Sequence, residues 1–243
     1  MTARAELTGG PDSDGRGADG LGADAAGNFD RLAGLYRWME WGTFGPWLGR
    51  CRRAFLDELA DARTALVLGD GDGRFTAALL AENERVEVDA VDASAGMLKA
   101  LKRRAGRGAG RVRAWVADAR RWEPDRRGYD LVATHFFLDC LTTDEVRALA
   151  ARMGPALRPG AAWVVSEFAV PDGVYGRVVA RPLVALLYLA FRVMTGLRVR
   201  RLPEHVEAME EAGFVLRARR RWLGGLLVAE KWADGSRKAS LDG

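Results

Sequence analysis

Residues 66–75 read Leu-Val-Leu-Gly-Asp-Gly-Asp-Gly-Arg-Phe. An apolar run ends in three glycines at every second position, and a helix-like stretch follows at once. Glycine suits places where the backbone takes a positive φ or approaches a ligand closely. A dinucleotide-binding turn has the spacing G-x-G-x-x-G, which would put its third glycine at position 74, and this position is Arg74. The third glycine is instead Gly73, so the turn favours a different nucleoside ligand.

Strand-like and helix-like segments alternate through the middle of the chain. We expect strands at 65–68, 86–91, 111–116, 129–134 and 161–168. The intervening helices include one that a capping box of Thr142 and Glu145 begins. This alternation predicts a parallel sheet with helices on both faces. Two later strands, joined by Gly224-Gly225, predict an antiparallel pair. The expected fold is therefore α/β, with a doubly wound, mostly parallel seven-stranded sheet.

The domain organisation follows from where large apolar residues occur. Residues 1–27 have almost none, so we expect a disordered tail. Residues 28–232 form one domain, with a helical cap at 28–60 and a helical insertion at 171–202, and 233–243 form a flexible tail. The stretch 174–195 is apolar nearly all round, which predicts a buried helix. The alternatives are a substrate-pocket wall, a dimer contact or a membrane-interface helix with basic flanks.

Composition limits the classes of function. The chain has 243 residues, a net charge of +4, two cysteines and two histidines. We therefore expect no disulfide framework and no metal site, and the cysteine usage suits a reducing cytoplasm. No secretory signal is visible, and the longest apolar stretch, 182–191, is too short to span a bilayer. The mild basic charge is consistent with a solvated arginine-rich surface.

Polar residues follow successive predicted strands. Asp92 lies 92 − 73 = 19 residues after the last glycine of the turn. An acidic residue at this place can accept hydrogen bonds from ribose hydroxyls. Ser94 then fits a helix N-cap, and Met97 can pack on an adenine face. Asp118, after the third strand, can accept from an exocyclic amine, so we expect one nucleoside site at the carboxyl edge of the sheet.

These motifs, in this order, resemble those of the class I methyltransferases that use S-adenosylmethionine. The resemblance covers residues 29–232 and is carried by Leu68–Gly73, Asp92–Leu98, Asp118-Ala119, Tyr129–Val132 and Leu157–Ala161. It implies a sheet whose last strand is antiparallel and an S-adenosylmethionine site over the first four strand ends. The implied cofactor contacts are Tyr36, Gly69, Asp70, Gly71, Gly73, Asp92, Ala93, Met97, Asp118, Ala119 and His135.

Two residues after the fourth strand are catalytic hypotheses. His135 has a near-neutral ordinary pKa and is the best base by location; its alternative role is packing. Asp139 could orient a substrate or the imidazole; its alternative role is helix capping. Glu167 is a further carboxylate at the same edge, and Cys140 is interpreted as a small core residue.

The sequence predicts the class of the methyl acceptor but not its identity. The Asn/Asp-Pro-Pro-aromatic signature of amino-methylating DNA enzymes is missing after the fourth strand, so we expect no nucleic-acid substrate. The aromatic N-terminal helices and the apolar insertion favour a small-molecule or lipid-like acceptor, with peripheral membrane contact as an option. One position departs from the family: Val67 stands where an acidic residue is usual. A non-catalytic cofactor-binding or scaffold protein with the same fold is therefore the alternative function.

Overall fold

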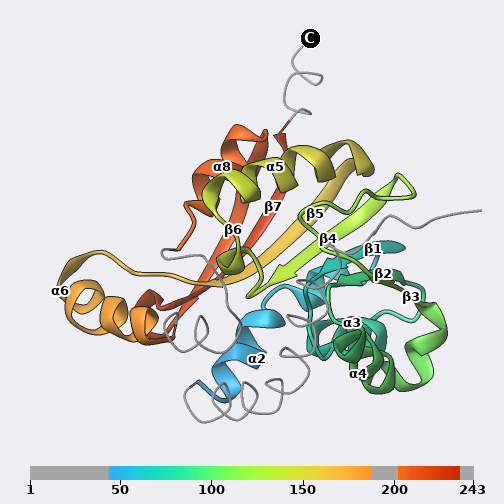
Figure 1. The fold of residues 1–243 in the computed structure, drawn as a ribbon, viewed down its shortest axis with the longest axis horizontal. Helices are drawn as coiled ribbons and strands as arrows, with labels where there is room; N and C mark the ends of the chain where they lie inside the picture. The colour runs from blue at the N-terminus through green and yellow to red at the C-terminus, as the bar shows by residue number, and fades with distance from the viewer. Residues whose placement is uncertain (1–43, 188–201, 236–243) are drawn as a thin grey trace, which may run out of the picture.

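A seven-stranded sheet forms the centre of the computed structural model, which describes residues 44–187 and 202–235. Figure 1 shows the sheet with helices on both of its faces. The strand order is β3-β2-β1-β4-β5-β7-β6. The strands are β1 (Thr64–Leu68), β2 (Glu87–Asp92), β3 (Val112–Val116), β4 (Tyr129–His135), β5 (Leu157–Phe168), β6 (Phe214–Trp222) and β7 (Leu227–Asp234).

Neighbouring strands from β3 to β5 are parallel, while β7 is antiparallel to both β5 and β6. This confirms the predicted doubly wound sheet and its antiparallel pair. Two boundaries differ from the sequence prediction by more than one residue. β5 begins at Leu157, before the Pro159-Gly160 turn, because Leu157 pairs with Tyr129 across a register shift. β7 continues past Trp232 to Asp234, because Phe214 pairs with Asp234.

The helices form two layers (Figure 1). One face of the sheet is covered by α2 (Pro46–Arg52), α3 (Arg74–Glu82) and α4 (Ala95–Ala105), and the other by α5 (Thr143–Met153) and α8 (His205–Glu211). Short 3-10 turns are η1 (Leu56–Leu59), η2 (Gly106–Arg111), η3 (Leu138–Cys140), η4 (Gly154–Ala156) and η6 (Leu223–Gly225). The predicted helix signals are confirmed: Ser94 caps α4, and Thr142 with Glu145 forms the capping box of α5.

Alternating side chains of each strand supply two hydrophobic clusters. On β1, Ala65 and Val67 face the α2–α3–α4 layer, whereas Leu66 and Leu68 face the α5–α8 layer. A central parallel strand covered on both faces is apolar throughout for this reason. All seven residues of β4 are buried in the same way.

The predicted helical cap is described in part. Four side chains of this region are buried against the sheet: Phe44 in the turn before α2, Leu48 and Cys51 in α2, and Phe55 after it. The expected helix around Phe29–Met39, including Tyr36, lies outside the described residues.

The insertion helix, defined here as residues 173–187, differs from the sequence prediction. It comprises α6 (Gly173–Tyr175), the π-helical segment η5 (Gly176–Ala180) and helical residues 181–187. Ala180 and Val184 are buried, but Val174, Val178 and Leu186 are more than 60% exposed. For the described residues the prediction of all-round burial was wrong, because only one side of the helix meets the sheet; residues 188–195 of the predicted stretch lie outside the described residues.

Within the described residues, no helix is both long enough and apolar enough to cross a membrane.

Asp89 joins three strands through a buried carboxylate. It is fully buried on β2 and accepts hydrogen bonds from the Tyr129 hydroxyl at 2.5 Å, Arg113 Nε at 2.6 Å and Arg126 Nε at 2.8 Å. Burial opposes its ionisation, but the hydrogen bonds from Arg113 and Tyr129 outweigh burial and hold the pKa of Asp89 below its ordinary value. Removing one partner of a buried ion pair is costly, because it leaves the other partners' charges uncompensated.

We expect Asp89→Ala to lower the free energy of unfolding by about 3 kcal/mol. Because the folded-state pKa is lowered, the contribution of Asp89 is present above its unfolded pKa near 4 and is lost as the pH falls below that value. Urea unfolding at pH 7 and pH 3.5 measures both effects. The exposed Asp61→Ala is the matched control and should leave the midpoint unchanged. Equal midpoints for Asp89→Ala and wild type would contradict the role of Asp89.

Candidate active site

The glycine turn after β1 passes between two packed side chains. Gly69, Gly71 and Gly73 have φ angles of 65°, 57° and 81°. A Cβ at Gly69 would lie 2.3 Å from the Phe137 ring, and one at Gly73 would lie 2.5 Å from Leu101 Cγ. Gly71 differs, because the nearest atom to its Cβ position is the sulfur of Met97 at 3.9 Å. Two glycines therefore serve packing, while Gly71 leaves room for a ligand.

Asp92 lies at the end of β2 beside this turn. Gly69 donates its N–H to the Val91 carbonyl at 2.9 Å, which ties the turn to β2. The Asp92 Oδ1 accepts the Ser94 N–H at 2.9 Å, and Ser94 Oγ accepts the Met97 N–H at 3.2 Å. The structure thus brings Asp92, Ala93 and Met97 to the glycine turn, as the motifs predict.

Asp118 follows β3 and lies next to Asp92 along the same edge, because the Ala117 N–H donates to the Asp92 carbonyl at 3.0 Å. Its carboxylate forms an ion pair with Arg120 at 2.7 Å, a partner that the sequence did not predict. Burial opposes ionisation of Asp118, but the hydrogen bonds from Arg120 hold its pKa below the ordinary value. Ala119 is buried beside it. An amine bound at Asp118 would therefore meet a carboxylate that is already charged and oriented.

The loop after β4 is bent sharply. Phe136 has a φ of 54°, which is uncommon for a residue with a Cβ and typical of functional sites. Its N–H donates to the Ser166 carbonyl at 2.7 Å, and its ring packs on Phe168 with centroids 5.2 Å apart. The Glu167 Oε1 accepts the N–H groups of Phe137 at 3.2 Å and Leu138 at 2.8 Å. Glu167 thus holds the start of η3 and the orientation of this loop.

His135 lies beneath the edge of the sheet. Its side chain is only 5% exposed and packs on Phe75, with ring centroids 4.2 Å apart. The Ser166 hydroxyl donates to the Cys51 carbonyl at 3.1 Å, so His135 Nδ1 must donate to Ser166 Oγ, 2.8 Å away. Nε2 then carries the lone pair, and it has no hydrogen-bond partner among the described residues. Burial, with a contribution from Arg52, lowers the pKa of His135 to about 3.

Asp139 is the carboxylate of the loop with the pKa closest to neutrality. Burial raises its pKa to about 6, and the neighbouring thiol of Cys140 donates to Oδ1 at 3.4 Å. Burial and the charge of Asp139 likewise raise the pKa of Glu167 well above its ordinary value. Glu167 Oε2 is buried and has no partner among the described residues. The two carboxyl groups therefore form a coupled pair at the ends of β4 and β5.

The two carboxylates of the glycine turn, Asp70 and Asp72, bond to other groups of the protein. Val67 is 1% exposed and belongs to the core beside α3. Asp70 accepts from the Thr76 N–H at 2.8 Å and the Thr76 hydroxyl at 2.7 Å, and so caps the first turn of α3. Asp72 forms an ion pair with Arg104 at 2.6 Å. Neither contact replaces an acid at position 67 directly.

Arg52 is a site residue that sequence reasoning missed. Its guanidinium lies 4.9 Å above the centre of the Phe136 ring, and its charge acts on both His135 and Asp70. Its residue type was no signal, because the arginine-rich composition is consistent with a solvated surface. Ser166 was also missed; its position at the end of β5, in register with His135, is the only signal that could have identified it.

We expect His135 to stay neutral in the folded protein between pH 4.5 and 8, because its pKa is lowered to about 3. NMR of the full chain measures this, with the two histidine resonances assigned by comparison with His135→Asn. The unfolded chain binds a proton below about pH 6.5, so this residue makes folding less favourable as the pH falls from about 6.5 toward 3. A His135 resonance that titrates near pH 6.5 would show that the imidazole is not enclosed.

The comparisons with known proteins agree with this geometry. Residues 65–160 match a family model described as a methyltransferase domain. No curated protein sequence matches the chain. Among solved structures, an O-methyltransferase family protein from Burkholderia thailandensis has a TM-score of 0.60 and 18% identity, covering 79% of this chain and 58% of that one.

Two further structures have the same fold. The mitomycin 7-O-methyltransferase MmcR has a TM-score of 0.64 and 15% identity, covering 86% of this chain and 60% of that one. DhpI in complex with SAH has a TM-score of 0.60 and 20% identity, covering 91% of this chain and 100% of that one. The chain thus spans less than two thirds of the length of two of these three proteins. Residues 65–160 thus match a methyltransferase domain, and the sheet order, with β7 antiparallel, is that of the methyltransferase fold.

Proposed function

We propose that the protein transfers a methyl group from S-adenosylmethionine to a small-molecule or lipid-like acceptor. One observation carries the proposal: the glycine turn, Asp92 and Asp118 lie at the ends of the neighbouring strands β1, β2 and β3. In open α/β sheets, ligands bind outside the carboxyl ends of the strands. The complex of the similar protein DhpI with SAH supports a cofactor of this type.

The residues present fit this cofactor. Gly71 leaves space beside Met97, where a Cβ would otherwise approach a bound ligand. We infer that Asp92 accepts from ribose hydroxyls, and that Asp118, beside Ala119, accepts from the adenine amine. S-adenosylmethionine, when bound, supplies a methyl group already activated by its sulfonium charge. The main task of the protein is then positioning, which is worth ~7–11 kcal/mol of barrier when orientation is good.

The acceptor is proposed to meet the loop after β4. A hydroxyl acceptor needs a general base with a pKa near the working pH. Asp139, with a pKa of about 6, fits this better than His135, whose pKa is about 3 and whose Nε2 is enclosed. We therefore propose Asp139 as the base and His135 as the residue that packs beneath the site. Two of the similar structures carry O-methyltransferase names, which supports a hydroxyl acceptor.

A non-catalytic cofactor-binding role is the second candidate. The observation that favours it is Val67, which fills the usual position of an acid with a core side chain. Under this alternative the chain binds S-adenosylmethionine and its demethylated product but never converts one to the other. A screen of acceptors that detects the demethylated cofactor distinguishes the two roles.

We expect Asp92→Ala to weaken the binding of S-adenosylmethionine and of its demethylated product at least tenfold, because it removes the ribose contacts. Isothermal titration of the full chain measures both affinities. Asp144→Ala is the control, since this side chain is 92% exposed on α5 and should bind as the wild type does. If wild type binds neither ligand at millimolar concentration, the cofactor assignment is wrong; if Asp92→Ala keeps wild-type affinity, the ribose role is wrong.

Gly71→Ala should weaken binding of the demethylated cofactor at least tenfold, because the added methyl would occupy the ligand side of the turn. The matched control is Gly106→Ala. Gly106 has a φ of 54°, similar to the 57° of Gly71, and its Cβ position has no atom within 4 Å. Alanine at a positive φ strains the backbone at either position, so the thermal midpoint of each variant is measured to confirm that it is folded. A threefold or smaller difference in affinity between Gly71→Ala and Gly106→Ala would contradict the ligand-facing role of Gly71.

A further inference from the structure

Exposed apolar side chains are concentrated on the insertion helix. Five of the eight exposed large apolar side chains of the described residues lie on it: Val174, Tyr175, Val178, Val179 and Leu186. Val174, Val178 and Leu186 are 69%, 67% and 63% exposed. Scattered apolar residues need no explanation, but a contiguous patch on one element marks an interaction site.

The inner face of the insertion helix packs against the rest of the protein, and this packing sets the orientation of its outer face. Ala180 and Val184 are buried in the cluster that also contains α2 and β7. The Tyr175 hydroxyl donates to the Leu223 carbonyl at 3.0 Å. A Cβ at Gly176 would lie 1.5 Å from the Pro171 carbonyl oxygen, so the start of the helix packs directly on the chain that leaves β5.

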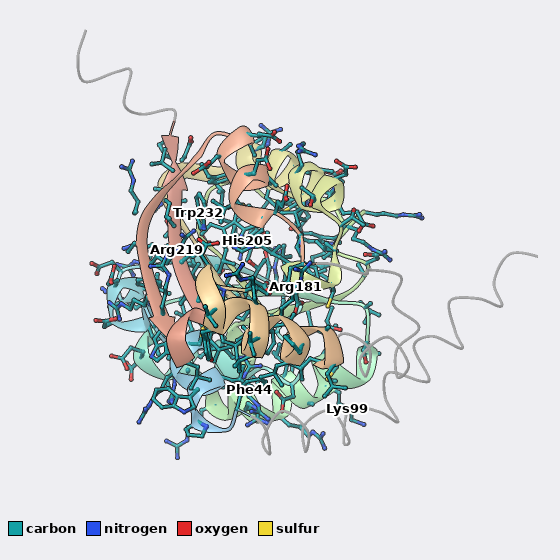
Figure 2. All side chains as sticks on the ribbon, turned by 90° about the vertical axis from the view of Figure 1, so that its left-hand side faces the viewer. Phe44, Lys99, Arg181, His205, Arg219 and Trp232 are labelled. Carbon is teal, nitrogen blue, oxygen red and sulfur yellow. The ribbon has the colours of Figure 1, made fainter. Side chains whose placement is uncertain are left out.

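The helix lies near the candidate active site. It begins at Gly173, five residues after β5 ends at Phe168. Figure 1 shows it extending away from the sheet beyond the end of β5, and Figure 2, turned by 90°, looks onto it and labels Arg181. A surface that contacts this helix would therefore lie close to the edge that carries Glu167 and the loop after β4.

The charge around the apolar patch has one sign. From Gly173 to Pro203 the sequence has six arginines and neither aspartate nor glutamate. Arg177 and Arg181, the two of these that the structure describes, are both exposed on the insertion helix. Arginine can keep its guanidinium in water or at phosphate groups while its aliphatic stem lies along apolar surface. An apolar face with arginine flanks is typical of helices that lie in the interface of a bilayer.

We propose that the insertion helix binds the surface of an anionic lipid bilayer, with Val174, Val178 and Leu186 inserted and Arg177 and Arg181 at the lipid phosphates. A second copy of the chain fits less well, because two-fold pairing would bring the arginines of both helices together. A membrane-spanning helix is not required, since an interfacial helix buries only one face in the bilayer. The proposal does not depend on methyl transfer; if that transfer is confirmed, the bilayer also becomes the source of a lipid-like acceptor.

Sedimentation of the full-length protein with vesicles tests the proposal. The vesicles are phosphatidylcholine alone, or phosphatidylcholine with 30 mole per cent phosphatidylglycerol. We expect partitioning onto the anionic vesicles at least tenfold stronger than onto the neutral ones. The double variant Val178→Asp/Leu186→Asp should partition onto the anionic vesicles at least tenfold more weakly than the wild type. The introduced carboxylates disfavour insertion into the bilayer and are repelled by the anionic surface. Arg177→Gln/Arg181→Gln should weaken binding to the anionic vesicles at least tenfold and leave binding to the neutral ones unchanged, because it removes the attraction of two positive charges to the negatively charged surface.

Controls separate this result from misfolding and from self-association. Val215→Asp introduces the same carboxylate at an apolar residue of β6 that is 40% exposed, and should partition as wild type does. Cofactor affinity and thermal midpoint should be the same in all variants, which keeps failure of this proposal distinguishable from failure of the proposed function. Absence of vesicle binding by the wild type would overturn the proposal. So would a dimer in light scattering that Val178→Asp/Leu186→Asp dissociates, since the patch would then be a contact between copies.

Discussion

The close approach of Gly69 to Phe137 and of Gly73 to Leu101 ties together the ends of β1 and β4 and the helix after β2. A Cβ at either glycine would lie within 2.5 Å of its neighbour, so the turn takes its path only without side chains there. Gly71, between them, is the member of the turn whose Cβ position stays open. This packing also sets the positions of Met97, which lies on the same helix as Leu101, and of Asp139, which lies in the loop after Phe137.

Carboxylates at the strand ends perform two different tasks, and the structure separates them. Asp70 and Glu167 hold backbone N–H groups of α3 and η3, which orders the loops around the site. Asp92 and Asp118 lie along the edge where a nucleoside would bind. Val67 can be a core residue in this arrangement, because Asp70 already orders the glycine turn through α3. The local fold of the turn therefore does not depend on an acid at position 67.

The sequence predicted the sheet, its antiparallel pair, the N-cap Ser94 and one capping box, because each depends on local signals such as the alternation of strands and helices. It also predicted that Asp92 and Met97 lie beside the glycine turn, but not that Phe137 and Leu101 pack against it. Other features depend on contacts between distant segments. The enclosure of His135 requires Ser166, Phe75 and Arg52, which come from three other parts of the chain. The exposure of Val178 and Leu186 could not be predicted from composition, because an apolar helix is buried only where the fold offers a surface to cover it.

The edge of the sheet therefore has two chemically different halves. Over β1, β2 and β3 it presents glycines and the carboxylates of Asp92 and Asp118, which match a polar nucleoside. Over β4 and β5 it presents aromatic rings, the coupled pair Asp139 and Glu167, and the start of an arginine-flanked apolar helix. Charged Arg52 above Phe136 lies between the halves. A carboxylate pair that shares burial favours having one member protonated, because two like charges in the same low-dielectric space repel. Asp139 can then accept a proton near neutral pH while Glu167 keeps the loop in place. The apolar surroundings that produce this pKa are also the surroundings that an apolar acceptor would enter.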